Sequence, residues 1–268
     1  GNIIPYMPDR YKEGYGISIK GINFAKEKGV NLIIALDCGI KAFENVKYAK
    51  ENKIDFIICD HHKPGIELPN AVAILNPKKS NCNYPFKDLC GCGIGFKLVQ
   101  ALSMQWDVNF DIVTDYLDLV AIATVSDLVP IIGENRILCY HGMKKLNETN
   151  KPGLKKFLSL SKSYINTSDI SFKIAPRINS AGRIDHSLEA FKLLTYNEIT
   201  DIEKQFIKIE KFNENRRLID EETTKEAIEL VENSKIKSNT TVVSSENWHK
   251  GVIGIVASRL IENYYKPT

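Results

Sequence analysis

The sequence predicts an α/β fold in which a parallel β-sheet is flanked by helices, followed by a long connecting helix and the start of a second α/β domain. Helical and strand patterns alternate over residues 18–75, as in the βα units that build parallel sheets. The two longest strand patterns are apolar runs that end in acid or imidazole groups. Residues 197–233 carry dense charges of both signs and contain no glycine or proline, which is typical of an exposed helix.

The predicted sheet lies in the first part of the chain. The spacing of apolar residues predicts helices over 18–29, 41–52 and 94–105, and strands over 31–36, 54–59 and 71–75. Residues 80–93 are rich in asparagine and glycine and are predicted to form a loop.

A largely helical region is predicted to follow. Residues 115–125 are almost wholly apolar, which indicates a buried helix that Pro130 closes. A further helix is predicted around 134–146, and several short helices are predicted to fill 153–195.

The last part of the chain is predicted to link two lobes. A continuous helix over 197–233 would be roughly 55 Å long. A strand is predicted at 240–244 and a helix at 252–263. The predicted division is a first domain over 1–196, a linker helix over 197–235 and the beginning of a second domain over 236–268. Because the chain starts at Gly1 and ends just after a helical pattern, both ends are expected to be cut from a longer protein.

Composition limits the class of protein only loosely. With 268 residues and 43% hydrophobic residues, the chain can bury a substantial core. A net charge of +3 permits nucleic-acid binding without arguing for it. The six cysteines include no CxxC pair and are expected to be reduced thiols in a cytoplasmic protein. No signal peptide is visible, and no apolar stretch approaches the ~20 residues that a membrane span needs.

Acid and imidazole groups follow two predicted parallel strands. Asp37 comes after the first run, and Asp60, His61 and His62 come after the second. Asp127 follows the predicted buried helix and lies among apolar residues, so its carboxylate needs a partner. Mixed carboxylate and imidazole ligands suit a divalent ion such as Mn²⁺. Taken singly, each aspartate could instead be a helix cap or a salt-bridge partner, and His61 a hydrogen-bonded turn residue.

Two later segments are candidates for binding phosphate. The first, 171–183, carries Arg177, Asn179 and Arg183 beside small residues, and arginines there suit bidentate phosphate recognition. The alternative is a helix cap whose arginines pair with nearby acids. The second, 248–260, begins with Trp248, which could stack on a base, and has glycines with free amides. The alternative is tight helix packing with the tryptophan at a domain interface.

The glycine-rich run from Gly91 to Gly95 is not interpreted as a dinucleotide-binding motif. It does not follow directly on a clear strand, which that motif requires. A helix start in a close-packed turn is the preferred interpretation.

The motifs resemble those of a known superfamily. Asp37 within Ala35–Ile40, the Asp60-His61-His62 triplet and the segment Val125–Pro130 resemble the DHH phosphoesterase superfamily. Three further segments narrow the resemblance to the RecJ family of single-strand-specific 5′→3′ DNA exonucleases, which act in repair and recombination. These segments are Pro8–Arg10 with Gly14–Gly16, Pro176–Arg183 and Trp248–Leu260.

This resemblance implies a phosphodiesterase that uses two Mn²⁺ or Mg²⁺ ions. Asp37 would bridge both ions, while His61 and Asp127 would bind one of them. His62 would lie against the phosphate or the second metal, and Asp60 would orient a histidine. The residues implied in holding single-stranded DNA are Arg177, Asn179, Arg183, Trp248, His249 and Ser258. Helicases and single-strand-binding proteins are the implied protein partners, and no membrane is involved.

The chain departs from the family pattern at both ends. The family's Asp-x-Asp-x-Asp-Gly motif and its later Gly-Gly-His motif are absent, so residues 1–196 would be a truncated DHH domain and 236–268 the start of a DHHA1 domain. We therefore expect the fragment to bind metal weakly and to cut DNA poorly or not at all. Two alternatives remain. One is a phosphodiesterase of the same superfamily acting on oligonucleotides or cyclic dinucleotides, or a related manganese pyrophosphatase. The other is a catalytically inactive module that binds nucleic acid or partners.

Overall fold

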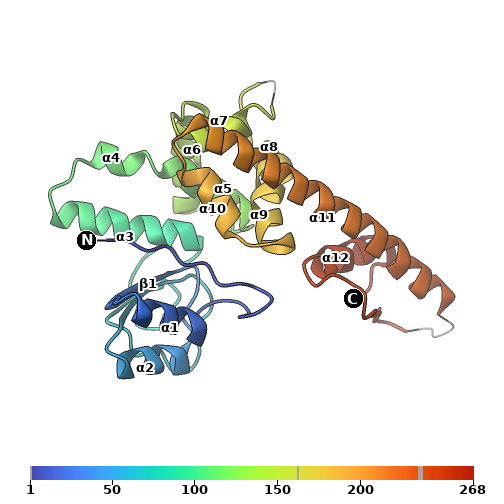
Figure 1. Ribbon diagram of the computed structural model, residues 1–268, viewed down its shortest axis with the longest axis horizontal. Helices are drawn as coiled ribbons and strands as arrows, with labels where there is room; N and C mark the ends of the chain where they lie inside the picture. Colours follow the sequence, from blue (N-terminus) through green and yellow to red (C-terminus); the bar gives the residue numbers. More distant parts are fainter. Residues whose placement is uncertain (1, 162, 235–237) are drawn as a thin grey trace. The chain divides into compact units, whose positions relative to one another are not determined.

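The computed structural model describes residues 2–161, 163–234 and 238–268 (Figure 1). Its internal contacts group into two compact units, Gly1–Ala175 and Pro176–Thr268. The division falls at the start of a helix, whereas the charge pattern placed a boundary after residue 196. The assignment of segments to a DHH domain, a linker helix and a DHHA1 domain stays a prediction.

The sheet of the first unit has three parallel strands in the order β1-β2-β3. They are β1 (Leu32–Leu36), β2 (Asp55–Cys59) and β3 (Ala73–Leu75). The register places Leu36 opposite Cys59 and Cys59 opposite Leu75, so all three strands end at one edge. The predicted strands and the parallel pairing are confirmed.

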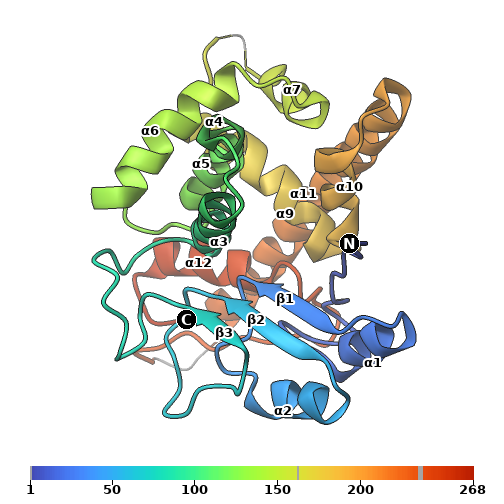
Figure 2. The same cartoon turned by 90° about the vertical axis from the view of Figure 1, so that its left-hand side faces the viewer.

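Helices cover both faces of this sheet (Figure 2). Two of them, α1 (Ile19–Glu27) and α2 (Phe43–Glu51), pack their apolar sides against Phe56 and Ile58 of β2. The hydroxyl of Ser18 caps α1 by accepting a hydrogen bond from the Gly21 amide at 2.9 Å, which satisfies a donor that the first turn leaves free. The other face is covered by α3 (Gly91–Gln105), whose Ile94 shares a core with Cys59.

Helix α3 begins at Gly91, so the predicted loop over 80–93 is three residues too long. Cys90 is the N-cap, and its thiol accepts a hydrogen bond from the Gly93 amide at 3.2 Å. Thiol capping is uncommon, which is why the cysteine gave no helix-start signal in the sequence. The preferred interpretation of the glycine run as a helix start is confirmed.

The rest of the first unit is helical, as predicted. It contains α4 (Phe110–Thr114), α5 (Leu117–Ser126), α6 (Gly133–Asn147), α7 (Pro152–Leu158), α8 (Thr167–Asp169) and the π-helical turn η1 (Ile170–Ile174). The apolar helix α5 is buried between neighbours. It crosses α6 closely at Gly142, where an added Cβ would lie 2.2 Å from the Leu117 carbonyl oxygen. This contact lets the two backbones approach and holds α5 in place.

Helix α9 (Ala175–Ile184) leads into the second unit, which also contains α10 (Leu188–Thr195), α11 (Ile199–Asn233) and α12 (Ile253–Tyr264). The predicted long helix is confirmed as the single 35-residue helix α11. It is not uniformly exposed, because Ile202, Ile209 and Ala227 are buried. Ala227 packs with Val256 and Leu260 of α12.

The strand predicted at 240–244 is wrong. These residues have no regular secondary structure, and the described chain contains no strand beyond β3 that could pair with them. A backbone hydrogen bond from the Thr241 amide to the Pro267 carbonyl, at 2.8 Å, connects this segment to the end of the chain. The β-propensity of threonine and valine does not form a strand without a neighbouring strand.

Glu189 of α10 is a buried acid with three polar partners. Its carboxylate accepts hydrogen bonds from Lys192 at 2.9 Å, Lys208 at 2.7 Å and the Gln205 amide at 3.0 Å. Burial acts to raise the pKa of Glu189, but the two lysines and Gln205 outweigh it and lower the pKa to about 2. The ionised carboxylate therefore ties α10 to α11.

We expect this carboxylate to make the stability of the second unit depend on pH. Because the folded-state pKa lies below the unfolded value, the stabilisation is complete above about pH 4.5 and is lost as the pH falls towards 2. The shift corresponds to about 3 kcal/mol at most. Urea unfolding should show Glu189→Gln less stable than wild type at pH 7, with the gap closing at low pH. A gap that stays constant from pH 7 to 2.5 would refute this.

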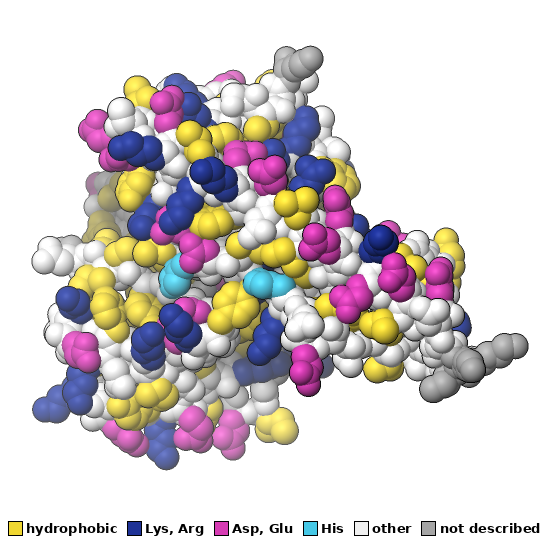
Figure 3. Space-filling model, turned by 45° about the vertical axis from the view of Figure 1, so that its right-hand side comes forward, with side chains coloured by type: hydrophobic (Ala, Val, Ile, Leu, Met, Phe, Trp, Pro, Cys, Tyr) yellow, Lys and Arg dark blue, Asp and Glu magenta, His cyan; other side chains and the backbone are white. Residues whose placement is uncertain are grey.

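Charge is mixed on the surface. On the face shown in Figure 3, lysine and arginine side chains alternate with aspartate and glutamate, and no continuous basic stripe is visible. Throughout the described residues, every helix is either too short or too polar to cross a lipid bilayer.

Candidate metal centre and phosphate-binding residues

The ends of β1 and β2 bring the candidate ligands of the first unit to one edge. Asp37 follows Leu36 directly, and its amide donates to the Cys59 carbonyl at 2.8 Å, which extends the strand pairing by one step. Asp60 and His61 follow Cys59 at the neighbouring position. Asp37 has a φ of 62°, a left-handed conformation that is uncommon for a residue other than glycine. Such a backbone persists only where the surrounding structure holds it.

Three side chains from separate segments meet at this edge. Asp127 is the C-cap of α5 and reaches the sheet edge from a different element. His61 Nε2 lies 3.3 Å from Asp37 Oδ1 and 3.4 Å from Asp127 Oδ2. One imidazole nitrogen thus faces two carboxylates that repel one another, an arrangement that a cation would stabilise.

His62 and Asp60 belong to the same cluster. Ligand atoms of Asp37, His61 and His62 all lie within 4.8 Å of one another. Asp60 Oδ1 lies 2.6 Å from His62 Nδ1, and Asp60 also accepts hydrogen bonds from the amides of Ile40 at 2.9 Å and His62 at 3.1 Å. Asp60 therefore fixes the ring of His62, whose side chain is 58% exposed.

The two aspartates at the strand ends have opposite electrostatic environments. Burial acts to raise the pKa of Asp60, but the hydrogen bonds from Ile40 and His62 outweigh it and hold the pKa below its usual value. Burial raises the pKa of Asp37, His61 opposes the rise, and the Asp127 carboxylate adds to it. Because the Asp37 side chain is 57% exposed, water screens much of this effect. Asp60 is thus the firmly ionised member, while Asp37 is the one that a positive charge would help to ionise.

Gly91 also belongs to this site, although nothing in the sequence indicated that role. A Cβ on Gly91 would lie 2.0 Å from Asp37 Oδ1 and 2.4 Å from its Cγ. The start of α3 therefore makes room for the Asp37 carboxylate only because residue 91 has no side chain. The glycine run was a visible signal, but its connection to Asp37 depends on tertiary packing.

The candidate phosphate-binding residues lie in the second unit, where two of the segments meet. Arg183 of α9 donates to the Gly251 carbonyl at 2.9 Å, next to the start of α12. His249 Nδ1 accepts a hydrogen bond from the Gly251 amide at 3.1 Å. The structure thus brings the 176–183 and 248–258 segments together.

The remaining candidates differ in how far they are already engaged. Arg177 pairs with Glu210 of α11, and Trp248 Nε1 donates to Glu226 at 2.9 Å. Ser258 is exposed and donates to the Gly254 carbonyl at 3.1 Å, and Asn179 is exposed on α9.

A buried aspartate lies beside these residues. Asp220 of α11 has 0% exposure, and its carboxylate lies 2.7 Å from Arg259 and 3.8 Å from Arg216. Because Arg259 follows Ser258 directly, Asp220 fixes this part of α12. In the sequence, Asp220 was one of many charges on the long helix, and no signal marked it as buried.

Comparison with known proteins shows what this chain is similar to. Residues 1–124 match the model of the DHH family, N-terminal domain. Over nearly its whole length the chain is similar to RecJ exonucleases. It is 42% identical over 265 residues to the single-stranded-DNA-specific exonuclease RecJ of Bacillus subtilis, covering 98% of this chain and 33% of that protein. It is 34% identical to the RecJ of Haemophilus influenzae, covering 97% of this chain and 48% of that protein.

A solved structure agrees with these relatives. The crystal structure of an exonuclease RecJ bound to manganese matches with a TM-score of 0.86 and 26% identity, covering 98% of this chain and 66% of that one. The chain therefore has the α/β fold of RecJ, as predicted. It spans half or less of the length of the curated relatives named above.

Proposed function

We propose that this chain is part of a metal-dependent exonuclease that degrades single-stranded DNA from the 5′ end in repair and recombination. The observation that carries the proposal is the convergence of Asp37, His61 and Asp127, which follow the ends of β1, β2 and α5. The names of the relatives support the substrate class, since both are single-stranded-DNA-specific exonucleases. The direction of digestion, and helicases and single-strand-binding proteins as partners, are proposed on the family resemblance alone.

The residues present fit Mn²⁺ or Mg²⁺. Two carboxylate oxygens and one imidazole nitrogen are hard-to-borderline donors, and no thiolate is among them. Asp37, His61 and Asp127 would hold one ion, and Asp37 is the candidate to reach a second. A divalent ion supplies charge neutralisation for a phosphodiester and activation of a water molecule towards it.

The histidine next to this set has a separate role in the proposal. Asp60 Oδ1 holds His62 through Nδ1 at 2.6 Å, so Nε2 is the ring nitrogen left for the substrate. His62 would then contact the scissile phosphate, with its ring orientation fixed by the buried carboxylate of Asp60.

The second unit would hold the DNA strand. Arg183 and His249 contact Gly251 just before α12, and Ser258 lies within α12. Guanidinium and hydroxyl groups there would favour phosphate oxygens. Arg177 and Asn179 on α9 and Trp248 would extend this surface. Because Arg177 pairs with Glu210, its contribution requires exchange of that ion pair for a phosphate.

Metal binding tests this proposal independently of turnover. We expect Asp37→Ala and His61→Ala to weaken Mn²⁺ binding at least ~10-fold in calorimetric titration, because each removes one of three donors. Asp55→Ala is the matched control, since Asp55 is an exposed acid at the opposite end of β2. Equal Mn²⁺ affinity in all four proteins would overturn the assignment of the metal centre.

The substrate class is tested with a 5′-labelled long single strand and a dinucleotide. We expect slow, Mn²⁺-dependent shortening of the long strand that Asp37→Ala abolishes. Turnover is expected to be slow because Asp37, His61 and Asp127 would hold one ion, whereas Asp37 alone among them is the candidate to reach the second. Preferential cleavage of the dinucleotide would instead identify an oligonucleotide phosphodiesterase of the same superfamily.

A further inference from the structure

An exposed apolar surface lies on the first unit, away from the candidate metal centre. The side chains of Met104, Trp106, Val108, Phe110 and Ile112 are 77%, 69%, 40%, 50% and 56% exposed. They come from the end of α3, the connection that follows and the start of α4, and we call them the α3–α4 patch. Five large apolar side chains within nine residues exceed the scattered exposure that is normal on protein surfaces.

The patch is built on an ordered scaffold. Val108 donates a backbone hydrogen bond to Ser103 at 2.8 Å, and Asn109 caps α4 by accepting from the Asp111 amide at 2.9 Å. Val113, in the same short helix, is 2% exposed and packs into the core with Cys59 and Leu117. Figure 2 looks onto this side of the first unit and shows α3 and α4 in front of α5. Since Val113 anchors the segment, the patch side chains are displayed on a fixed surface.

The electrostatics of this region differ from those of the rest of the chain. No lysine, arginine or histidine occurs between Lys97 and Arg136, whereas the same stretch carries six acids. Asp107 and Asp111 lie within the patch and are exposed. Asp115 pairs with Lys145 at 2.7 Å, so its charge is partly compensated. The patch is therefore apolar and acidic in a chain whose net charge is +3.

This charge decides among the possible occupants. Nucleic acid and anionic membranes present phosphates that Asp107 and Asp111 would repel. A second copy docked through the same patch would place these acids against their own equivalents, because a two-fold interface pairs like with like. We propose that the α3–α4 patch docks a protein segment that presents apolar side chains flanked by lysine or arginine. An amphipathic basic helix has that chemistry.

The test uses two synthetic helical peptides with the same leucine stripe, one flanked by lysines and the other by glutamates. Binding is followed through the emission of Trp106 in a Trp248→Phe background. We expect the lysine peptide to shift the emission to shorter wavelength and to bind at least ten-fold more tightly than the glutamate peptide. Phe110→Ser is expected to weaken binding of the lysine peptide at least ten-fold. Ile66→Ser changes a fully exposed apolar side chain elsewhere in the first unit and should leave the affinity for the lysine peptide unchanged.

The charge contribution is tested by the double variant Asp107→Asn/Asp111→Asn. Its affinities for the lysine and glutamate peptides should lie within about three-fold of one another. Mn²⁺ affinity should stay at the wild-type value in Phe110→Ser, so loss of docking is separable from failure of the metal centre. Three results would overturn the proposal: equal affinity for the two peptides, displacement of the lysine peptide by single-stranded DNA, or self-association that Phe110→Ser abolishes.

Discussion

Replacing Gly91 by alanine is expected to weaken Mn²⁺ binding by roughly 10–100-fold, as loss of a residue supporting a metal ligand does. The new Cβ would lie 2.0 Å from Asp37 Oδ1, so the carboxylate must leave its position beside His61. The backbone of Asp37 is already in the left-handed region and has little freedom to adjust. Overpacking at this contact should also lower the free energy of unfolding by about 1–3 kcal/mol.

The control is Gly93→Ala, two residues along the same helix. The nearest atom to its added Cβ is Cys90 Sγ at 3.5 Å, an ordinary contact. Because alanine favours helix over glycine by roughly 1 kcal/mol, this variant should be at least as stable as wild type and bind Mn²⁺ normally. Wild-type Mn²⁺ affinity in Gly91→Ala, measured by calorimetry, would show that Asp37 is not a ligand in the position described.

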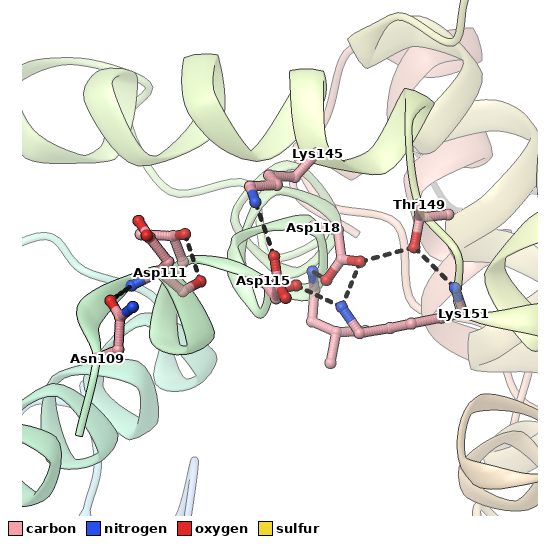
Figure 4. A network of polar contacts seen from close by, with 9 residues as sticks. Asn109, Asp111, Asp115, Asp118, Lys145, Thr149 and Lys151 are labelled. Carbon is pink, nitrogen blue, oxygen red and sulfur yellow. Dashed lines mark hydrogen bonds and ion pairs between the residues drawn. The ribbon is translucent and has the colours of Figure 1, made fainter.

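Replacing Asp118 by alanine is expected to lower the free energy of unfolding by about 3 kcal/mol, the range for breaking a buried ion pair. Asp118 lies in the first turn of α5 and is 1% exposed (Figure 4). Its Oδ2 accepts from Lys151 at 2.6 Å and from the Thr149 hydroxyl at 3.0 Å. Without the carboxylate, the half-buried Lys151 ammonium keeps its hydrogen bond to the Asp115 carbonyl but loses its ion-pair partner, so the variant loses more than one hydrogen bond.

Asp115→Ala is the matched control for Asp118→Ala. Asp115 also pairs with a lysine, Lys145 at 2.7 Å, but its side chain is 63% exposed. Exposed pairs contribute little, so urea unfolding should show a midpoint close to that of wild type. Adding Lys151→Met to Asp118→Ala should recover part of the lost stability, because the uncompensated charge is removed. Equal losses in Asp115→Ala and Asp118→Ala would contradict this account.

Helix α5 connects Asp118 to the candidate metal centre. Asp118 is in the first turn of α5 and Asp127 is its C-cap, so one rigid helix connects them. The sequence predicted that α5 is buried, because its residues are almost wholly apolar. The sequence did not show which lysine would neutralise the acid at its start, since Lys151 is 33 residues away.

The strand-end residues were predictable for a simple geometric reason. Neighbouring parallel strands end at the same edge, so Asp37 and His61 had to be close once the two apolar runs were recognised as adjacent strands. The same local reasoning failed at 240–244, where threonine and valine favour a strand but no partner strand is available in the described chain. Local pattern identifies strands reliably only where a second strand accompanies them.

The amino-acid sequence by itself determined the order of helices and strands in the first unit, the parallel sheet, the long helix α11 and the residue types of the candidate metal centre. Those properties follow from apolar periodicity and from chemistry carried by short contiguous motifs. Tertiary structure alone decided that Asp127 meets His61, that Gly91 clears space for Asp37 and that Asp220 is buried beneath Arg259. These contacts join residues tens of positions apart, and their geometry depends on how whole helices pack, which short-range pattern does not encode.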